Sequence, residues 1–149
     1  MFGAGRGFWA SKSVMSERVA IRFANDAFYQ AFADADLSAM DRIWAPQGRV
    51  FCCHPGWPPL TTRDEVMASW GRIFSAGGAM PIRCLAPDIG VFGGTGLVCC
   101  YESLGGTAFV VTNLFIKAGQ GWCIFHHHAG PIGALPAGIE PDESTGPRH

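Results

Sequence analysis

Four hydrophobic segments between Ile82 and Ala129 constrain the fold of this chain more than any other feature. They are rich in Val, Ile, Phe, Thr, Cys and Tyr, and short Gly-rich breaks separate them. Segments of this composition are typical of β-strands, and such short breaks are typical of hairpins. The sequence therefore predicts an antiparallel meander with strands at 82–92, 97–104, 107–118 and 122–129.

The chain before this meander has mainly a helical period instead, apart from a predicted strand at 49–54. Over 16–35 the apolar residues recur every three or four positions, as on a helix with one buried face. The same spacing predicts a short second helix at 37–44, which forms a hairpin with the first. Thr62 and Glu65 match a capping box, which predicts a third helix that ends near the glycines at 77–78. Helices followed by a meander place the chain in the α+β class.

The length of the chain fits one domain and is too short for two, because 149 residues support a single core. Its 48% hydrophobic and 12% aromatic residues are typical of a folded protein. We expect the domain at 16–132, between a loose extension at 1–15 and a disordered tail at 133–149. Met15 is an alternative start, since it directly precedes the first helical signal.

The charge pattern argues against several partners and compartments. A net charge of -1 without a Lys/Arg cluster gives no electrostatic footprint for nucleic acid. The longest uncharged stretches, 89–101 and 103–116, are shorter than the ~20 apolar residues that span a bilayer. The first residues lack the apolar region of a secretory signal. We therefore expect a cytoplasmic protein with no nucleic acid and no membrane partner.

Nucleotide and hydrolase motifs are absent from the sequence. No G-x-S-x-G, P-loop or dinucleotide-binding fingerprint occurs, because the glycine runs do not lie between a strand and a helix. We expect no cofactor.

The six cysteines are expected to be reduced thiols in the core. None forms C-x-x-C, and adjacent cysteines on a strand point to opposite faces. Free cysteine is a common small buried residue. The six are Cys52, Cys53, Cys84, Cys99, Cys100 and Cys123.

Glu102 is the only charged residue between Ile89 and Ile116. A carboxylate among strands is costly unless it is paired, protonated or hydrated, so it lies at an edge or in a pocket. If the glycines at 105–106 form a two-residue turn, the pairing places Glu102 and Asn113 on the same face of the sheet.

A second two-residue turn at 119–120 would add histidines to this face. It would pair Asn113 with His126, and it would place His128 two residues further along on the same side. A slip of one residue would instead place His127 there. We predict that Glu102, Asn113, His126 and His128 converge.

Three interpretations of these residues stay open. Glu102 and a nearby histidine could form an acid–base dyad, with Glu102, His126 and His128 as the catalytic candidates. The alternating histidines together with His54 could bind a divalent metal. No strong ligand spacing supports this alternative, and we predict no metal site. The third interpretation is a polar patch satisfied by Asn113 and ordered water. The expected lining of the pocket is Tyr29, His54, Trp57, Trp70 and Asn113.

Four segments together carry a family pattern. They are Phe28-Tyr29-Gln30-Ala31-Phe32, Asp36-Leu37-Ser38-Ala39-Met40 with Trp44-Ala45, His54-Pro55-Gly56-Trp57, and Trp122 leading to His126-His127-His128-Ala129. With these segments the chain resembles the SnoaL-like subgroup of the nuclear transport factor 2-like superfamily. The resemblance covers about residues 16–132.

The resemblance implies a cone-shaped fold in which a curved, mixed or mainly antiparallel sheet wraps around the helices. In this family a pocket lies between the concave face and the helices, and the convex face commonly makes a homodimer. Isomerases and cyclases of the family use an Asp or His of the pocket for proton transfer. That role carries over to Glu102 and to His126 or His128, whereas no aspartate stands in the facing strands.

Two functions of different kinds are consistent with this reading. One is a pocket protein for a small organic ligand, with cofactor-independent proton transfer of the isomerase, cyclase or dehydratase type. The other is a non-catalytic binding or dimerisation module. An enzyme needs an open cavity with two polar groups near one ligand position, whereas Trp57 or Trp70 can plug a module that only associates.

Overall fold

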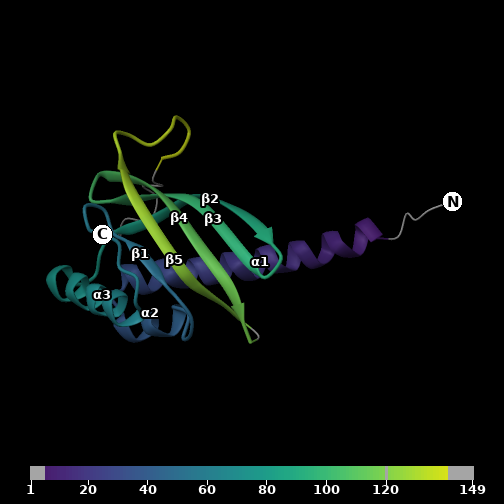
Figure 1. The fold of residues 1–149 in the computed structure, drawn as a ribbon. Coiled ribbons are helices and arrows are strands. Elements are labelled where there is room, and N and C mark those ends of the chain that lie inside the picture. The colour runs from purple at the N-terminus through teal and green to yellow at the C-terminus, as the bar shows by residue number, and fades with distance from the viewer. Residues whose placement is uncertain (1–5, 120, 141–149) are drawn as a thin grey trace, which may run out of the picture.

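A computed structural model describes residues 6–119 and 121–140 of the chain. In this part of the chain, three helices lie against one face of a five-stranded sheet with the order β1-β5-β4-β3-β2 (Figure 1). The elements are α1 (Arg6–Ala33), α2 (Leu37–Ile43), β1 (Phe51–Cys53), α3 (Arg63–Gly77), β2 (Ile82–Phe92), β3 (Thr95–Leu104), β4 (Thr107–Ala118) and β5 (Gly121–Ile132). The predicted α+β class with a mainly antiparallel sheet is confirmed.

Helix α1 begins at Arg6, not at the predicted Ser16. Its sheet-facing side follows the predicted helical spacing, with Ile21 and Phe28 fully buried. The part before Ile21 projects beyond the sheet (Figure 1). The helix therefore continues through most of the expected loose extension, and residues 1–5 lie outside the described part of the chain.

The starts of α2 and α3 have the side-chain caps that satisfy free backbone N–H groups. The carboxylate of Asp36 accepts a hydrogen bond from the backbone N–H of Ala39 at 3.0 Å. At α3 the predicted capping box is present, with Thr62 and Glu65 bonded to each other's backbone N–H groups. Gly78, with φ of 60°, closes the C-terminal end of α3.

The register between β3 and β4 is the one expected from a two-residue glycine turn. Leu104 pairs with Thr107 across the turn, and further along the hairpin Val98 pairs with Asn113. Glu102 lies on the same face as Val98, since the two residues are an even number of positions apart. The predicted common face of Glu102 and Asn113 is therefore confirmed.

The register between β4 and β5 differs from the prediction in its second half. Ala118 pairs with Gly121, as a two-residue turn requires, and this register continues to the pair Phe115–Ile124. The next pair is Leu114–His126, so a bulge in β5 leaves Phe125 unpaired. Beyond the bulge Asn113 pairs with His127 instead of His126. A bulge inserts one extra residue into one strand, and so it exchanges the two faces for every later residue.

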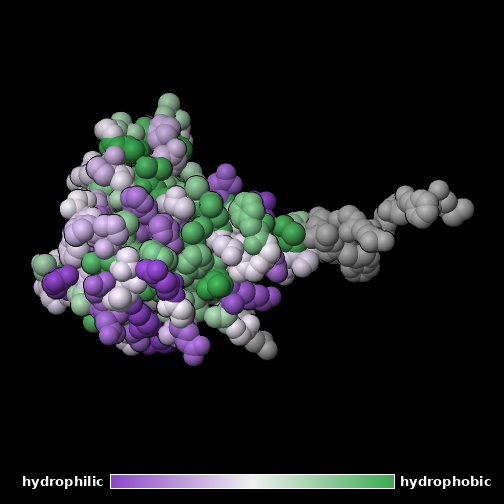
Figure 2. All heavy atoms as spheres, viewed as in Figure 1, coloured by the Kyte–Doolittle hydropathy of each residue, from purple (hydrophilic) through white to green (hydrophobic). Residues whose placement is uncertain are grey.

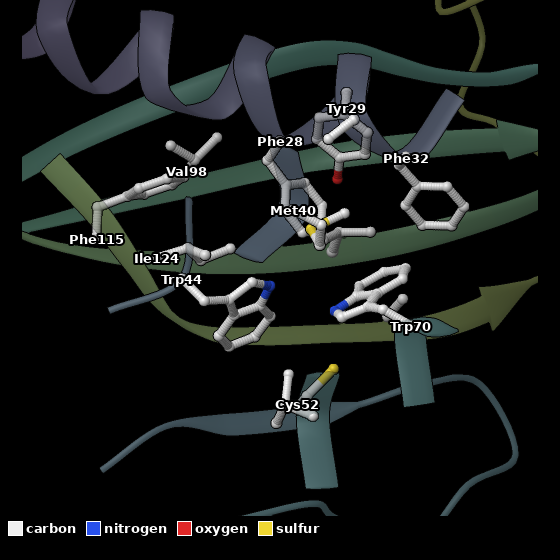
Figure 3. Close-up of a cluster of buried hydrophobic side chains, with 14 of the residues drawn as sticks. Phe28, Tyr29, Phe32, Met40, Trp44, Cys52, Trp70, Val98, Phe115 and Ile124 are labelled. Atoms are coloured by element: carbon white, nitrogen blue, oxygen red, sulfur yellow. The ribbon is translucent and has the colours of Figure 1, made fainter. Parts of the chain in front are cut away.

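Aromatic side chains fill the space between the helices and the inner face of the sheet (Figure 3). Phe28 and Phe32 of α1 pack edge to face against Trp70 of α3, with ring centroids 5.7 and 4.9 Å away. Trp44 is 1% exposed and lies in the same cluster. All six cysteines are free thiols, but Cys99 is exposed and not in the core as expected.

The segment after β5 bends back along the β3–β4 hairpin. A hollow of about 390 Å3 is lined by Thr107 and Ala108 of the hairpin and by Leu135 and Ile139 of this segment. The expected tail at 133–149 is thus placed as far as residue 140, and the rest lies outside the described residues. Within the described residues, no helix is both long and apolar enough to cross a bilayer.

Candidate functional site

Four elements bring polar side chains together inside the cone. Tyr29 comes from α1, Glu102 from β3, Asn113 from β4 and His127 from β5, and each is at most 6% exposed. The hydroxyl of Tyr29 donates a hydrogen bond to Oε1 of Glu102 at 2.7 Å. Glu102 and Asn113 converge as predicted, but the histidine beside them is His127 and not His126 or His128; Tyr29 joins the cluster.

Asn113 connects the members of this cluster. Its Nδ2 donates to Oδ1 of Asn25 at 3.0 Å and to the hydroxyl of Tyr29 at 3.4 Å. Its Oδ1 lies 2.6 Å from Nδ1 of His127, so that ring nitrogen carries the proton. The other ring nitrogen, Nε2, then presents its lone pair toward Glu102, whose Oε1 is 4.0 Å away.

Burial makes both Glu102 and His127 prefer their neutral forms. Burial raises the pKa of Glu102 to about 7, although the hydrogen bond from Tyr29 acts in the opposite direction. Burial, and then the nearby His54, hold the pKa of His127 well below its usual value. The contact between them is therefore not an ion pair near neutral pH, and the cluster can hold one proton on Glu102.

His126 and His128 do not lie where the sequence predicted. The bulge in β5 turns both toward the outer face of the sheet, where their ring centroids are 6.3 Å apart. His128 is exposed and His126 is half-buried. The expected register was wrong by one residue, and His127 occupies the inner position. A catalytic role for His126 or His128 stays a prediction without support from the interior geometry.

His54 lies inside the fold and apart from the outer histidines. Its Nε2 is 2.8 Å from Oγ of Ser69, which donates its own proton to the carbonyl of Val66 at 2.6 Å, so Nε2 of His54 donates. Burial, and then Arg72, lower the pKa of His54 to about 4. Among the described residues, no group of three His, Cys, Asp or Glu side chains is placed to hold a metal ion. The alternative of a shared site for His54, His126 and His128 is therefore wrong.

The two predicted pocket tryptophans lie in different environments. Trp70 is fully buried, and its ring contacts His54 at a centroid distance of 4.8 Å. It lies between α3 and the aromatic residues of α1 and so plugs the cone (Figure 3). Trp57 is 36% exposed and packs against His54 on one side and Arg72 on the other, outside the interior.

Four hollows among the described residues lie away from Glu102 and His127. One of about 340 Å3 lies between α1 and α2, and one of about 160 Å3 lies beside His128 on the outer face. A third, of about 290 Å3, is bordered by Tyr101, Val110 and Ile139. Neither Glu102 nor His127 lines these hollows or the one at the β3–β4 hairpin.

Two buried polar residues of the interior were not predicted from the sequence. Asn25 is fully buried and bonds to Asn113, and fully buried Ser69 bonds to His54. Asn25 lies four positions after Ile21 and four before Tyr29, so the helical spacing that marked the buried face could have found it. Ser69 lies three positions after Val66 and four before Ile73, so the spacing of the third helix could have found it in the same way.

Comparison with known proteins agrees with the fold. Residues 21–132 match the SnoaL-like domain, and the chain belongs to this family. The match covers all the strands and residues 21–33 of α1, and these elements supply the side chains of the polar cluster.

Solved structures extend the likeness. A proposed dehydratase of the nuclear transport factor 2-like family from Streptomyces avermitilis is 32% identical, with a TM-score of 0.74, over 80% of this chain and 98% of that one. A proposed calcium/calmodulin-dependent protein kinase type II association domain from Thiobacillus denitrificans is 31% identical, with a TM-score of 0.68, over 73% and 92%.

A curated plant protein shares part of its length with this chain. The F-box protein SKIP8 of Arabidopsis thaliana is 27% identical over 112 residues, which are 74% of this chain and 48% of that protein. The chain thus spans about half the length of the curated relative that it matches. The fold is one that serves as a scaffold for ligand binding or isomerase-type chemistry, and also for association.

Proposed function

We propose that this chain is a non-catalytic module that associates with a second copy through the outer face of its sheet. The observation that carries the proposal is the plugged interior: Trp70 occupies the cone, and Glu102, Asn113 and His127 take their partners from within the protein. An enzyme of this fold needs space for a substrate beside its acid or base.

The outer face offers what a protein interface needs. Val110 and Ile116 of β4 are 46% and 43% exposed, although both are large apolar residues. Half-buried Leu114 extends the apolar row between them. The hollow beside His128 gives this face a depression that a side chain of a second copy can enter. The likeness to an association domain supports the same reading.

The proposal is tested by measuring the mass of the full chain in solution at increasing concentration, by sedimentation velocity. We expect a reversible dimer, and we expect Val110→Asp to make it monomeric, because a buried unpaired carboxylate at an interface is costly. Leu37→Asp is the matched control, since Leu37 is 41% exposed but lies on α2. A chain that stays monomeric at about 100 µM, or a dimer that Val110→Asp leaves intact, would contradict the proposal.

A proton-transfer enzyme is the second candidate, and one observation favours it. Glu102 has a pKa of about 7 and contacts the hydroxyl of Tyr29, which suits a group that exchanges a proton near neutral pH. This function requires the aromatic plug to move. A screen of small carboxylates and aromatic ketones would favour it if one compound raised the melting temperature of the native protein but not of Glu102→Gln.

A further inference from the structure

The projecting part of α1 touches the rest of the protein on one side only. Ile21 and Phe28 bury the sheet-facing side of the helix. Closer to the N-terminus, the contact is an ion pair between Glu17 and Lys117 of β4, with Nζ and Oε1 3.9 Å apart. Beyond this point the helix extends away from the sheet (Figure 1). Among the described residues, no other element lies against its opposite side there.

That opposite side carries exposed apolar residues. Met15, Val19 and Phe23 are 63%, 56% and 71% exposed. Residues four positions apart lie on the same face of a helix, so Met15, Val19 and Phe23 form one stripe. Figure 2 shows hydrophobic side chains where the helix leaves the folded body. Large exposed apolar residues in a row mark an interaction surface.

The charge beside this stripe is positive. Arg18 and Arg22 are exposed and lie along one flank of it. Glu17 is turned toward Lys117 on the other side of the helix. Asp26 is exposed at the end of the stripe nearest the body, one turn beyond Arg22.

This combination of groups distinguishes between partners. An antiparallel pair of two α1 helices would bring the same flank of each together, and so Arg18 and Arg22 would face their own copies. A nucleic acid would use the arginines but leave the apolar stripe in water. An anionic lipid surface takes up both, because the apolar side enters the acyl boundary while the arginines meet the headgroups.

We propose that the projecting part of α1, with Met15, Val19 and Phe23 as its apolar contact and Arg18 and Arg22 as its charged contact, binds the surface of anionic membranes. A helix that lies on a bilayer needs one apolar side and not a spanning length. The proposal therefore agrees with the lack of a membrane-spanning helix among the described residues. It modifies the sequence-based expectation of no membrane partner.

The experiment is sedimentation of the full chain with vesicles. Vesicles of phosphatidylcholine with about one third phosphatidylserine should bind the protein at low salt, at least about tenfold more tightly than phosphatidylcholine alone. The double variant Arg18→Gln/Arg22→Gln should weaken binding about 25-fold, at about fivefold per arginine. Arg42→Gln is the matched control, since this exposed arginine lies on α2, and it should bind as the native protein does.

The apolar contact is tested with Val19→Asn/Phe23→Asn, which should also weaken vesicle binding by at least about tenfold while leaving the circular dichroism unchanged. Equal binding to both vesicle types, or native-like binding by either double variant, would overturn the proposal. A change in sedimentation coefficient of Val19→Asn/Phe23→Asn without vesicles would also overturn it, because the stripe would then be a contact between proteins.

Discussion

At the scale of single residues, Glu102 lies in the interior and is only 3% exposed. Its carboxyl group accepts a hydrogen bond from the hydroxyl of Tyr29. Burial raises its pKa to about 7, so the folded protein keeps a proton that the unfolded chain releases at its ordinary pKa of 4.5. The contribution of Glu102 to stability is therefore present below about pH 4.5 and is lost as the pH rises to about 7.

The buried histidines act in the opposite direction. The pKa of His54 is lowered to about 4 and that of His127 also lies below its ordinary value. The unfolded chain takes up their protons first, so their contribution is present above about pH 6.5 and is lost as the pH falls. Two buried histidines oppose one carboxyl group, so the stability of the native protein should rise with pH across this window. The effect of Glu102 is then visible only by comparison with a variant.

Glu102→Gln isolates that effect, because glutamine keeps an acceptor for Tyr29 and cannot ionise. From pH 5 to pH 8 the free energy of unfolding of the variant should gain about 2–3 kcal/mol relative to the native protein, at about 1.4 kcal/mol per pKa unit. Urea denaturation at several pH values measures it. Asp88→Asn, at an exposed carboxylate of β2, is the control and should show no such gain. Parallel curves for Glu102→Gln and the native protein would show that Glu102 is ionised in the fold.

At the scale of elements, the bulge in β5 decides which histidines face the interior. Before the bulge the strand follows the register that its turn sets, and beyond it every side chain has changed face. His127 enters the polar cluster, and His126 and His128 face outward. One extra residue in β5 thus removes His126 and His128 from the interior site and makes His127 its histidine.

Chemical labelling should reproduce this assignment. Diethyl pyrocarbonate, which reacts with accessible neutral imidazoles, should modify His128 rapidly and His126 more slowly, and should spare His127 and His54. The measurement is mass spectrometry with fragmentation, at high dilution so that no second copy covers the outer face. In guanidinium chloride all four should react alike. Faster labelling of His127 than of His128 in the folded protein would support the original register instead.

At the scale of the whole molecule, Trp70 joins the helix layer to the sheet layer. Its ring contacts Phe28 and Phe32 of α1, Phe74 of its own helix and His54 after β1. Its indole N–H has no hydrogen-bond partner among the described residues. The contribution of this side chain to stability is therefore packing, and its volume is what closes the cone.

Trp70→Ala should lower the free energy of unfolding by about 3–5 kcal/mol, because it leaves a cavity in the core. Trp70→Phe should cost less, since a ring remains and no hydrogen bond is lost. Thermal melts of the alanine variant with added indole measure the cavity, and bound indole should restore part of the melting temperature. A loss below about 1 kcal/mol would show that the interior is already open, which would favour the enzyme.

Most of the helices and strands could be predicted from the sequence, because helical and strand periods, caps and glycine turns are local properties. The register of β3 with β4 followed from one turn, and the capping box at Thr62 from two residues. The same glycine turn placed Glu102 and Asn113, two members of the buried cluster, on one face of the sheet.

Tertiary structure alone decided the face of β5 and the filling of the cone. The bulge leaves Phe125 of β5 unpaired, and no glycine marks it in the sequence. It directly precedes the residues of β5 that pair with β1. The closure by Trp70 depends on how α3 packs against α1, which no spacing within α3 records. Local periods set which residues are buried, whereas packing between distant segments sets whether space remains among them.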